Sequence, residues 1–201
     1  MTYEPLAAPS RSRRGCLPVV LAVLGAGAAL AAVGVASRDD RPSPAASGGP
    51  AGCTAERSVP YGSDVSKHVE GVVSYDDVPP ASGPHSPVPL SAARRVITRE
   101  GAPLYVAERA VHNLEHGYVV VWYDTRATDD DVDAVAKAVR AVRQHKVLLV
   151  PWTHGGWDGP AFVVTAWGHQ LPCARPDTAT IEDFYGRYGG PNGEAPEPSA
   201  N

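Results

Sequence analysis

The sequence predicts an α+β fold: a small single-domain sandwich in which a short mixed sheet packs against two to three helices, preceded by one transmembrane helix. Three observations support this prediction. Residues 17–36 form a 20-residue run without a charge. Residues 129–145 repeat apolar side chains at the spacing of an amphipathic helix. Apolar runs at 118–123, 147–150 and 162–167 are typical of buried strands. The order of strand, long helix, strand and strand favours a crossover unit.

The uncharged run at 17–36 is long enough to cross about 30 Å of hydrocarbon as a helix. Basic residues precede it in the polar segment 1–16, which we expect to be a disordered cytoplasmic tail. Residues 37–52 are rich in Pro, Ser, Ala and Gly and predict a flexible linker. The sequence therefore predicts a single-pass protein of the cell membrane with an extracytoplasmic C-terminal domain. A signal peptide cleaved near residues 35–37 is the alternative.

The charge balance gives no sign of a nucleic-acid partner. The chain has a formal net charge of −4, and the part after residue 37 holds 15 basic and 21 acidic residues. Such a balance provides no basic surface for a phosphate backbone. The membrane is then the one partner that the sequence predicts.

The three cysteines differ in their setting. Cys16 precedes the apolar run, so it is not the cysteine of a lipoprotein signal. Cys53 and Cys173 belong to the extracytoplasmic part, where an oxidising compartment favours a disulfide between them. This bridge would close a loop on the order of 100 residues and stabilise the fold by up to about 4 to 5 kcal/mol. The sequence has no Cys-x-x-Cys pair, which argues against a dithiol redox enzyme.

The globular domain is predicted to span residues 53–193, followed by a disordered tail at 194–201. Its first helix is short, covers 106–116 and ends at Gly117, because glycine commonly terminates helices. Capping pairs mark the starts of the two later helices, namely Thr128 with Asp131 for 129–145 and Thr180 with Asp183 for 181–188.

The stretch from Val111 to Gly117 holds the densest set of metal-capable side chains in the chain. His112 and His116 are four residues apart on the short helix, so they point the same way and two imidazoles can bind one ion. Glu115 lies on the flank of that face. The C-terminal end of a helix also carries a negative partial charge that favours a cation. The alternative is that these are ordinary histidines held by backbone hydrogen bonds.

Two further histidines precede this helix. His85 ends the loop 79–85, whose prolines make it stiff, and a rigid loop is a suitable carrier for a third ligand. His68 begins a short extended segment and is the candidate for a fourth ligand. Solvent exposure is the alternative for a loop histidine. The remaining histidines are predicted to be solvated or to be optional ligands: His145, His154 and His169.

The string from His112 to His116 also fits the pattern H-x-x-E-H, in which two histidines bind zinc and the glutamate is the general base. In this interpretation Glu115 is catalytic and the protein is a metal-dependent hydrolase. The chain has only 85 residues after His116 for a further ligand, a substrate cleft and the rest of the fold. Its size therefore argues against this interpretation.

Several motifs together are typical of a known family: His68-Val69, Tyr75, Pro79-Pro80-x-Ser82-Gly83-Pro84-His85, residues 111–117 and Ala166-Trp167-Gly168. The family that they resemble is the bacterial domain-of-unknown-function family 3105. Members look like membrane-anchored or exported proteins with no established activity. The resemblance covers residues 53–193 and implies those domain limits. Residues 87–103 depart from the family pattern because they hold few aromatic residues. The histidines that the resemblance selects are His68, His85, His112 and His116.

The leading interpretation is an anchored extracytoplasmic domain that binds a transition metal. Zinc, copper and nickel all accept three imidazoles. The only methionine is Met1, so a thioether copper(I) site is not predicted. The alternatives are the hydrolase and a metal-free structural or interaction module. The predicted ligands are His112, His116 and His85, with His68 or Glu115 completing the set.

Overall fold

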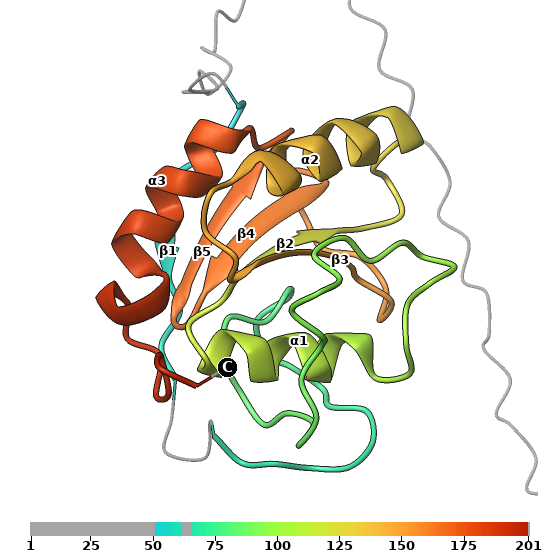
Figure 1. The fold of residues 1–201 in the computed structure, drawn as a ribbon. Helices are drawn as coiled ribbons and strands as arrows, with labels where there is room; N and C mark the ends of the chain where they lie inside the picture. The colour runs from blue at the N-terminus through green and yellow to red at the C-terminus, as the bar shows by residue number, and fades with distance from the viewer. Residues whose placement is uncertain (1–50, 62–65, 201) are drawn as a thin grey trace, which may run out of the picture. The chain divides into compact units, whose positions relative to one another are not determined.

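The computed structural model describes residues 51–61 and 66–200 (Figure 1). Within these residues the fold is α+β, with a five-stranded mixed sheet and three α-helices. The strands are β1 (Arg57–Ser58), β2 (Val119–Tyr123), β3 (Val147–Pro151), β4 (Phe162–Ala166) and β5 (His169–Cys173). The helices are α1 (Val106–Glu115), α2 (Asp129–Ala141) and α3 (Thr178–Tyr188), with a short 3-10 helix η1 (Gly190–Asn192). The strand order in the sheet is β1-β5-β4-β2-β3.

The sheet has helices on both faces, and β2 shows why its sequence is continuously apolar. All five residues of this strand are buried. Val119 and Val121 belong to the cluster that α2 and α3 cover, whereas Val120 belongs to the cluster on the face of α1. Successive side chains of a strand point to opposite faces, so both sets must be apolar here. Figure 1 shows α1 on the opposite side of the sheet from α2 and α3.

The segment from β2 through α2 to β3 is the crossover unit that the sequence predicts, because β2 and β3 are parallel neighbours. The sequence pattern does not predict β5, since Gln170 and Pro172 interrupt its apolar run. This strand pairs antiparallel with β4 through the turn Trp167-Gly168. Gly168 has a φ of 74° there, and a Cβ on it would lie 2.8 Å from the Tyr61 ring.

The helix α2 begins as predicted but ends earlier than residue 145. Thr128 Oγ1 accepts the backbone N–H of Asp131 at 3.2 Å. At the other end Val142 is buried and takes an extended conformation, with ψ 131°. The Arg95 guanidinium donates to the Val142 carbonyl at 3.2 Å and so satisfies an acceptor at the end of the helix. The periodicity of the sequence does not reveal this distant partner.

The helix α3 begins earlier than predicted and has a different cap. Its N-cap is Asp177, whose carboxylate accepts the backbone N–H of Thr180 at 2.8 Å. Thr180 is therefore inside the helix and is not its cap, which corrects the proposed pairing with Asp183. The correct cap also lies three residues before the N–H that it accepts, the spacing that capping requires.

The domain extends beyond its predicted limits of 53–193 at the N-terminal side. Cys53 and Cys173 form the predicted disulfide. Just before it, the carbonyls of Ala51 and Gly52 accept backbone hydrogen bonds from the chain that follows β5. These two residues belong to the domain and not to the linker, because the backbone pairing at Cys53 continues through them.

Residues 194–200 correct the predicted disordered tail, because they lie against the end of α1. The backbone N–H of Glu197 donates to the Glu115 carbonyl at 3.0 Å. Lys146 Nζ donates to the carbonyls of His116, Pro198 and Ala200. The tail is polar and has no apolar period, so its composition does not reveal these contacts to backbone carbonyls.

The predicted N-terminal tail, the membrane helix and most of the linker lie outside the described residues. In the part of the chain that the structure describes, no helix is long and apolar enough to span a membrane.

Candidate metal centre

The helix α1 is almost completely buried, although it is rich in polar side chains. Nine of its ten residues are buried. Burying a polar group costs free energy unless a partner satisfies it, so each of these side chains requires a partner. The buried polar residues of α1 are Glu108, His112, Asn113 and Glu115.

Asn113 has a structural role. Its Oδ1 accepts the Leu90 backbone N–H at 2.8 Å, and its Nδ2 donates to the Leu90 carbonyl at 3.1 Å. These two bonds attach the loop before α1 to the helix. Asn113 is therefore satisfied, and it is not needed in the site.

The chain segments that carry His68 and His85 are paired with each other. The Val69 N–H donates to the His85 carbonyl at 2.8 Å, and the His85 N–H donates to the Lys67 carbonyl at 3.0 Å. These two backbone hydrogen bonds form a short parallel β-bridge, which fixes the spacing of the two imidazoles. The His85 ring is fully buried, whereas the His68 side chain is 51% exposed.

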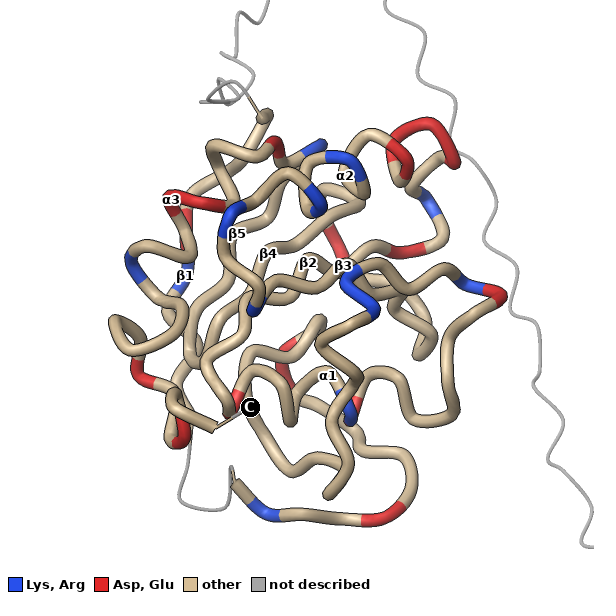
Figure 2. Tube along the Cα trace, in the orientation of Figure 1, with Lys and Arg blue, Asp and Glu red and all other residues tan. Residues whose placement is uncertain are grey.

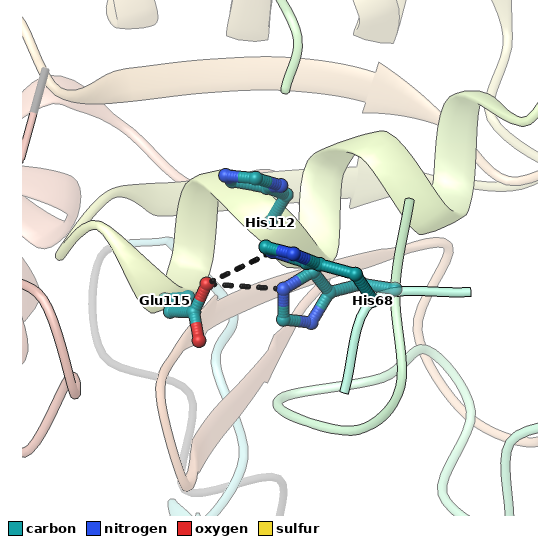
Figure 3. A group of neighbouring side chains, drawn as sticks. His68, His112 and Glu115 are labelled. Atoms are coloured by element: carbon teal, nitrogen blue, oxygen red, sulfur yellow. Dashed lines mark hydrogen bonds and ion pairs between the residues drawn. The ribbon is translucent and has the colours of Figure 1, made fainter. Parts of the chain in front are cut away.

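The structure brings four of the five predicted site residues together, and Figure 3 labels His68, His112 and Glu115 among them. The potential ligand atoms of His68, His85, His112 and Glu115 all lie within 4.8 Å of one another. The His68 and His112 rings stack with centroids 5.0 Å apart, and the His85 centroid is 5.1 Å from each. Glu115 Oε2 is 3.0 Å from His85 Nε2 and 3.8 Å from His68 Nε2. The His85 ring is therefore close enough to serve as a third ligand.

Hydrogen bonds determine which nitrogen of two rings is protonated. His85 Nδ1 donates to the Gly83 carbonyl at 2.8 Å, and His112 Nδ1 donates to the Ser86 carbonyl at 2.7 Å. A carbonyl oxygen only accepts, so each Nδ1 carries a proton. In a neutral ring the Nε2 atom then has a free lone pair. Metal-ligating histidines are commonly oriented by backbone carbonyls in this way.

Glu115 and His85 are so close that a proton or a metal ion must lie between their facing atoms. Glu115 Oε2 and His85 Nε2 are 3.0 Å apart, and both side chains are buried. A carboxylate and an unprotonated imidazole nitrogen are both acceptors, so a proton or a metal ion must lie between them. Burial lowers the pKa of the neighbouring His112, with a further lowering from the nearby histidines. The centre therefore combines imidazole and carboxylate side chains, the donor types that bind transition metals.

His116 lies outside this group of four, which corrects the prediction of one shared set. Its Nε2 is 3.2 Å from His112 Nε2, as the helical spacing predicts. Residues four apart on a helix are also displaced by about 6 Å along its axis, so the two rings reach different neighbours. The neighbour of His116 is Glu197, whose Oε2 lies 3.5 Å from His116 Nε2. Glu115, His116 and Glu197 form a second group of potential ligand atoms within 4.8 Å.

The sequence interpretation does not include Glu197, because it lies in the predicted tail. It also omits Glu108, which is fully buried on α1 and accepts the Val73 N–H at 2.9 Å. Glu108 could have been recognised from the sequence, because it lies four residues before His112 and therefore on the same helical face. Its neighbour is His154, whose Nε2 lies 3.9 Å from Glu108 Oε1.

The other histidines do not join either group of potential ligands. His145 is exposed, as predicted. His169 stacks on Tyr188 with ring centroids 3.8 Å apart. The optional ligand roles of His154 and His169 are therefore not supported by their positions.

An α+β domain with a buried histidine and glutamate cluster is thus the class of protein that the fold and the site define. The chain belongs to the family described as "Protein of unknown function (DUF3105)", whose model matches residues 67–201. This match confirms the resemblance that the histidine motifs indicate, and it includes Glu197. No curated protein and no solved structure matches the chain.

Proposed function

We propose that this is a transition-metal-binding domain, which holds one ion through three imidazoles and one carboxylate. The observation that carries the proposal is the 3.0 Å approach of His85 Nε2 to Glu115 Oε2. A divalent ion between these two buried acceptors removes the conflict of their lone pairs, and two further imidazoles lie within reach of it. The proposed ligands are His68, His85, His112 and Glu115.

A proton shared by His85 and Glu115 is the metal-free alternative. It satisfies that one pair, but it does not explain why His68 and His112 bring two more imidazoles to the same place. Three nitrogen ligands and one oxygen ligand match the four-coordinate sites of zinc. Two of the rings, His85 and His112, each donate a hydrogen bond to a backbone carbonyl. Such bonds orient the ligands in metal sites.

We propose zinc as the ion, with copper as the main competitor. Imidazoles bind zinc, copper and nickel, and raw affinity is highest for copper(II). A set of four protein ligands suits the tetrahedral preference of zinc. A competition titration with zinc, copper(II) and nickel(II) on the full-length protein would establish the order of affinity.

A binding role fits Glu115 better than a catalytic one. In an H-x-x-E-H hydrolase the glutamate remains free to take a proton from water. Here Glu115 Oε2 lies 3.0 Å from His85 Nε2 and belongs to the ligand group. The hydrolase is therefore the second candidate, and it requires that Glu115 leave His85 when the metal binds.

We also propose that a membrane helix at 17–36 holds the domain outside the cytoplasm. The uncharged run with its basic flank supports this topology. The disulfide between Cys53 and Cys173 supports an oxidising compartment. Protease added to intact spheroplasts should remove the C-terminal domain, and full protection of that domain would contradict the topology.

A nucleic-acid partner is not part of this proposal. In the view of Figure 2, the Lys and Arg residues of the described chain are interspersed with Asp and Glu and do not form one basic stripe. Proteins that bind nucleic acid need such a stripe to neutralise phosphates. The prediction of no nucleic-acid partner follows from charge alone.

Metal analysis of the purified full-length protein tests the binding proposal. We expect bound metal after purification, its removal by a chelator and a raised thermal midpoint after zinc is restored. Free zinc at 100 times its Kd should stabilise the fold by about 2.7 kcal/mol. Identical thermal midpoints with and without zinc or copper would leave only the metal-free interpretation.

A further inference from the structure

His116 and Glu197 present metal-capable atoms that the proposed ion does not use. We propose that they hold a second divalent ion next to the first, with the Glu115 carboxylate bridging the two. The centre would then be dinuclear, and its second site would consist of Glu115, His116 and Glu197. This inference rests on the proposed function, because it extends the same centre.

The distances within this second group suit coordination better than a hydrogen bond. His116 Nε2 and Glu197 Oε2 are 3.5 Å apart, which is longer than an ordinary N–H···O bond of about 2.7 to 3.2 Å. Zinc binds imidazole nitrogen and carboxylate oxygen at about 2.0 to 2.2 Å, so two ligand atoms on one tetrahedral ion are about 3.4 Å apart. All three potential ligand atoms lie within 4.8 Å of one another.

In the described part of the chain, the His116 ring lacks the hydrogen bond from Nδ1 to a backbone carbonyl that orients His85 and His112. Its Nδ1 is buried and has no hydrogen-bond partner among the described residues. Leaving a buried polar group unpaired is unfavourable. The polar groups that face its Nε2 are His112 Nε2 at 3.2 Å and Glu197 Oε2 at 3.5 Å. Coordination at Nε2 would replace the hydrogen-bond contact with His112 and the longer approach of Glu197 by a metal–ligand bond.

Backbone contacts hold Glu197 next to the end of α1. The Glu197 N–H donates to the Glu115 carbonyl, one of the carbonyls that a helix end leaves unpaired. Lys146 Nζ then donates to carbonyls on both sides of this junction, at His116 and at Pro198. The side chain of Glu197 is 60% exposed, so the second site opens to solvent.

Charge predicts that the two ions bind with unequal affinity. Two divalent ions bring four positive charges to a centre that has two carboxylates, Glu115 and Glu197. In two-metal sites the ions are about 3.5 to 4 Å apart, so the first ion repels the second. Lys146 adds a further positive charge close to His116, although burial lowers its pKa. We therefore expect stepwise binding, in which the exposed second site fills last.

The number of ions per chain tests the second site directly. Full-length protein, stripped with a chelator, is titrated with zinc, and bound metal is measured at each free concentration. We expect two ions per chain, the second at least about 10-fold weaker, which corresponds to about 1.4 kcal/mol. Loading with copper(II) should give a spin-coupled electron paramagnetic resonance spectrum at two equivalents and an uncoupled one at a single equivalent.

The variant Glu197→Gln should reduce the stoichiometry to one ion and abolish the spin coupling, while the first ion binds with its usual affinity. Glu194→Gln is the matched control, because Glu194 is an exposed carboxylate of the same tail that contacts Tyr61 instead of His116. It should retain two ions. Thermal midpoints of the metal-free variants verify that both still fold.

Each result has one meaning. One ion in the wild-type protein at saturating zinc overturns the second site and leaves the proposed function intact. Two ions in Glu197→Gln overturn the assignment of Glu197 as a ligand. No bound ion in the wild-type protein overturns the proposed function together with this inference.

Discussion

The helices α1 and α2 lie on opposite faces of the same sheet, but they are stabilised in different ways. The helix α2 has an N-cap at Thr128, and it buries one apolar face through Val135 and Val139. The helix α1 has no side-chain cap, and its N-cap residue Tyr105 has a φ of 56°, a conformation that costs a non-glycine residue free energy. Most of α1 is buried, including its polar side chains.

This difference shows where the polar chemistry of the molecule is concentrated. An amphipathic helix such as α2 needs only a sheet to cover its apolar stripe. A buried helix with several polar side chains is stable only if the loops around it supply matching donors and acceptors. For α1 those loops bring His68, His85 and Leu90, so the same contacts that stabilise the helix also assemble the candidate site.

The largest effect is expected when a ligand next to α1 is removed. His85→Ala should lower zinc affinity by more than about 100-fold, because losing only an outer-shell partner already costs up to that factor. His145 follows α2, is exposed and belongs to neither ligand group, so His145→Ala should leave affinity unchanged. Competition against a chromogenic chelator measures both variants. Equal affinities in the two variants would contradict the role of His85.

A second comparison concerns stability without metal. Asn113→Ala should lower the free energy of unfolding by about 2 kcal/mol, because it leaves the buried N–H and carbonyl of Leu90 without partners. Lys137→Ala, an exposed substitution on α2, should change it by less than about 0.5 kcal/mol. Urea denaturation of the chelated full-length variants gives both values. A loss below about 0.5 kcal/mol for Asn113→Ala would show that the loop does not depend on this contact.

The pH dependence of stability provides a third test. Burial lowers the pKa of both His112 and His116 from the usual 6.5. Between 6.5 and the lowered values, the unfolded chain binds more protons than the folded chain does. Stability should therefore fall as the pH is lowered from about 6.5 and level off below the folded-state pKa.

The thermal midpoint of the metal-free protein measures this fall between neutral and mildly acidic pH. His116→Gln should flatten the profile, because it removes one of the two buried bases. His145 is exposed and lies in neither ligand group, so His145→Gln serves as the control. A wild-type midpoint that is constant across this range would contradict neutral, buried histidines at the site.

Elements that depend on local patterns were predictable from the sequence. The strand β2, the helix α2 and the short helix α1 follow from continuous or periodic apolar residues. The strand β5 has no such pattern, because its pairing partner β4 and the turn at Gly168 define it. Residues 194–200 are positioned by hydrogen bonds to backbone carbonyls at the end of α1. Every residue has a backbone carbonyl, so the sequence does not indicate which of them accept these bonds.

The site was predictable to the extent that motifs and helical geometry define it. His112 and Glu115 follow from their helix, and the motifs that mark the family select His68 and His85. The sequence does not predict that His85 and His116 belong to different groups. This depends on where along α1 the loop that carries His85 packs. Glu197 reaches the site through tertiary contacts alone, so no spacing in the sequence indicates it.

The smallest expected effect distinguishes the two possible caps of α3. Asp177 accepts the Thr180 backbone N–H, and this hydrogen bond lowers the pKa of the Asp177 carboxyl. Asp177→Ala should therefore cost about 1 kcal/mol of stability, or about 2 to 4 °C in the thermal midpoint. Thr180→Ala keeps that backbone N–H, so it should cost only a few tenths of a kcal/mol. Thermal unfolding of the two variants at neutral pH makes the comparison. A larger loss for Thr180→Ala would identify Thr180 as the cap. The capping-pair pattern that located the start of α2 would then also locate the start of α3.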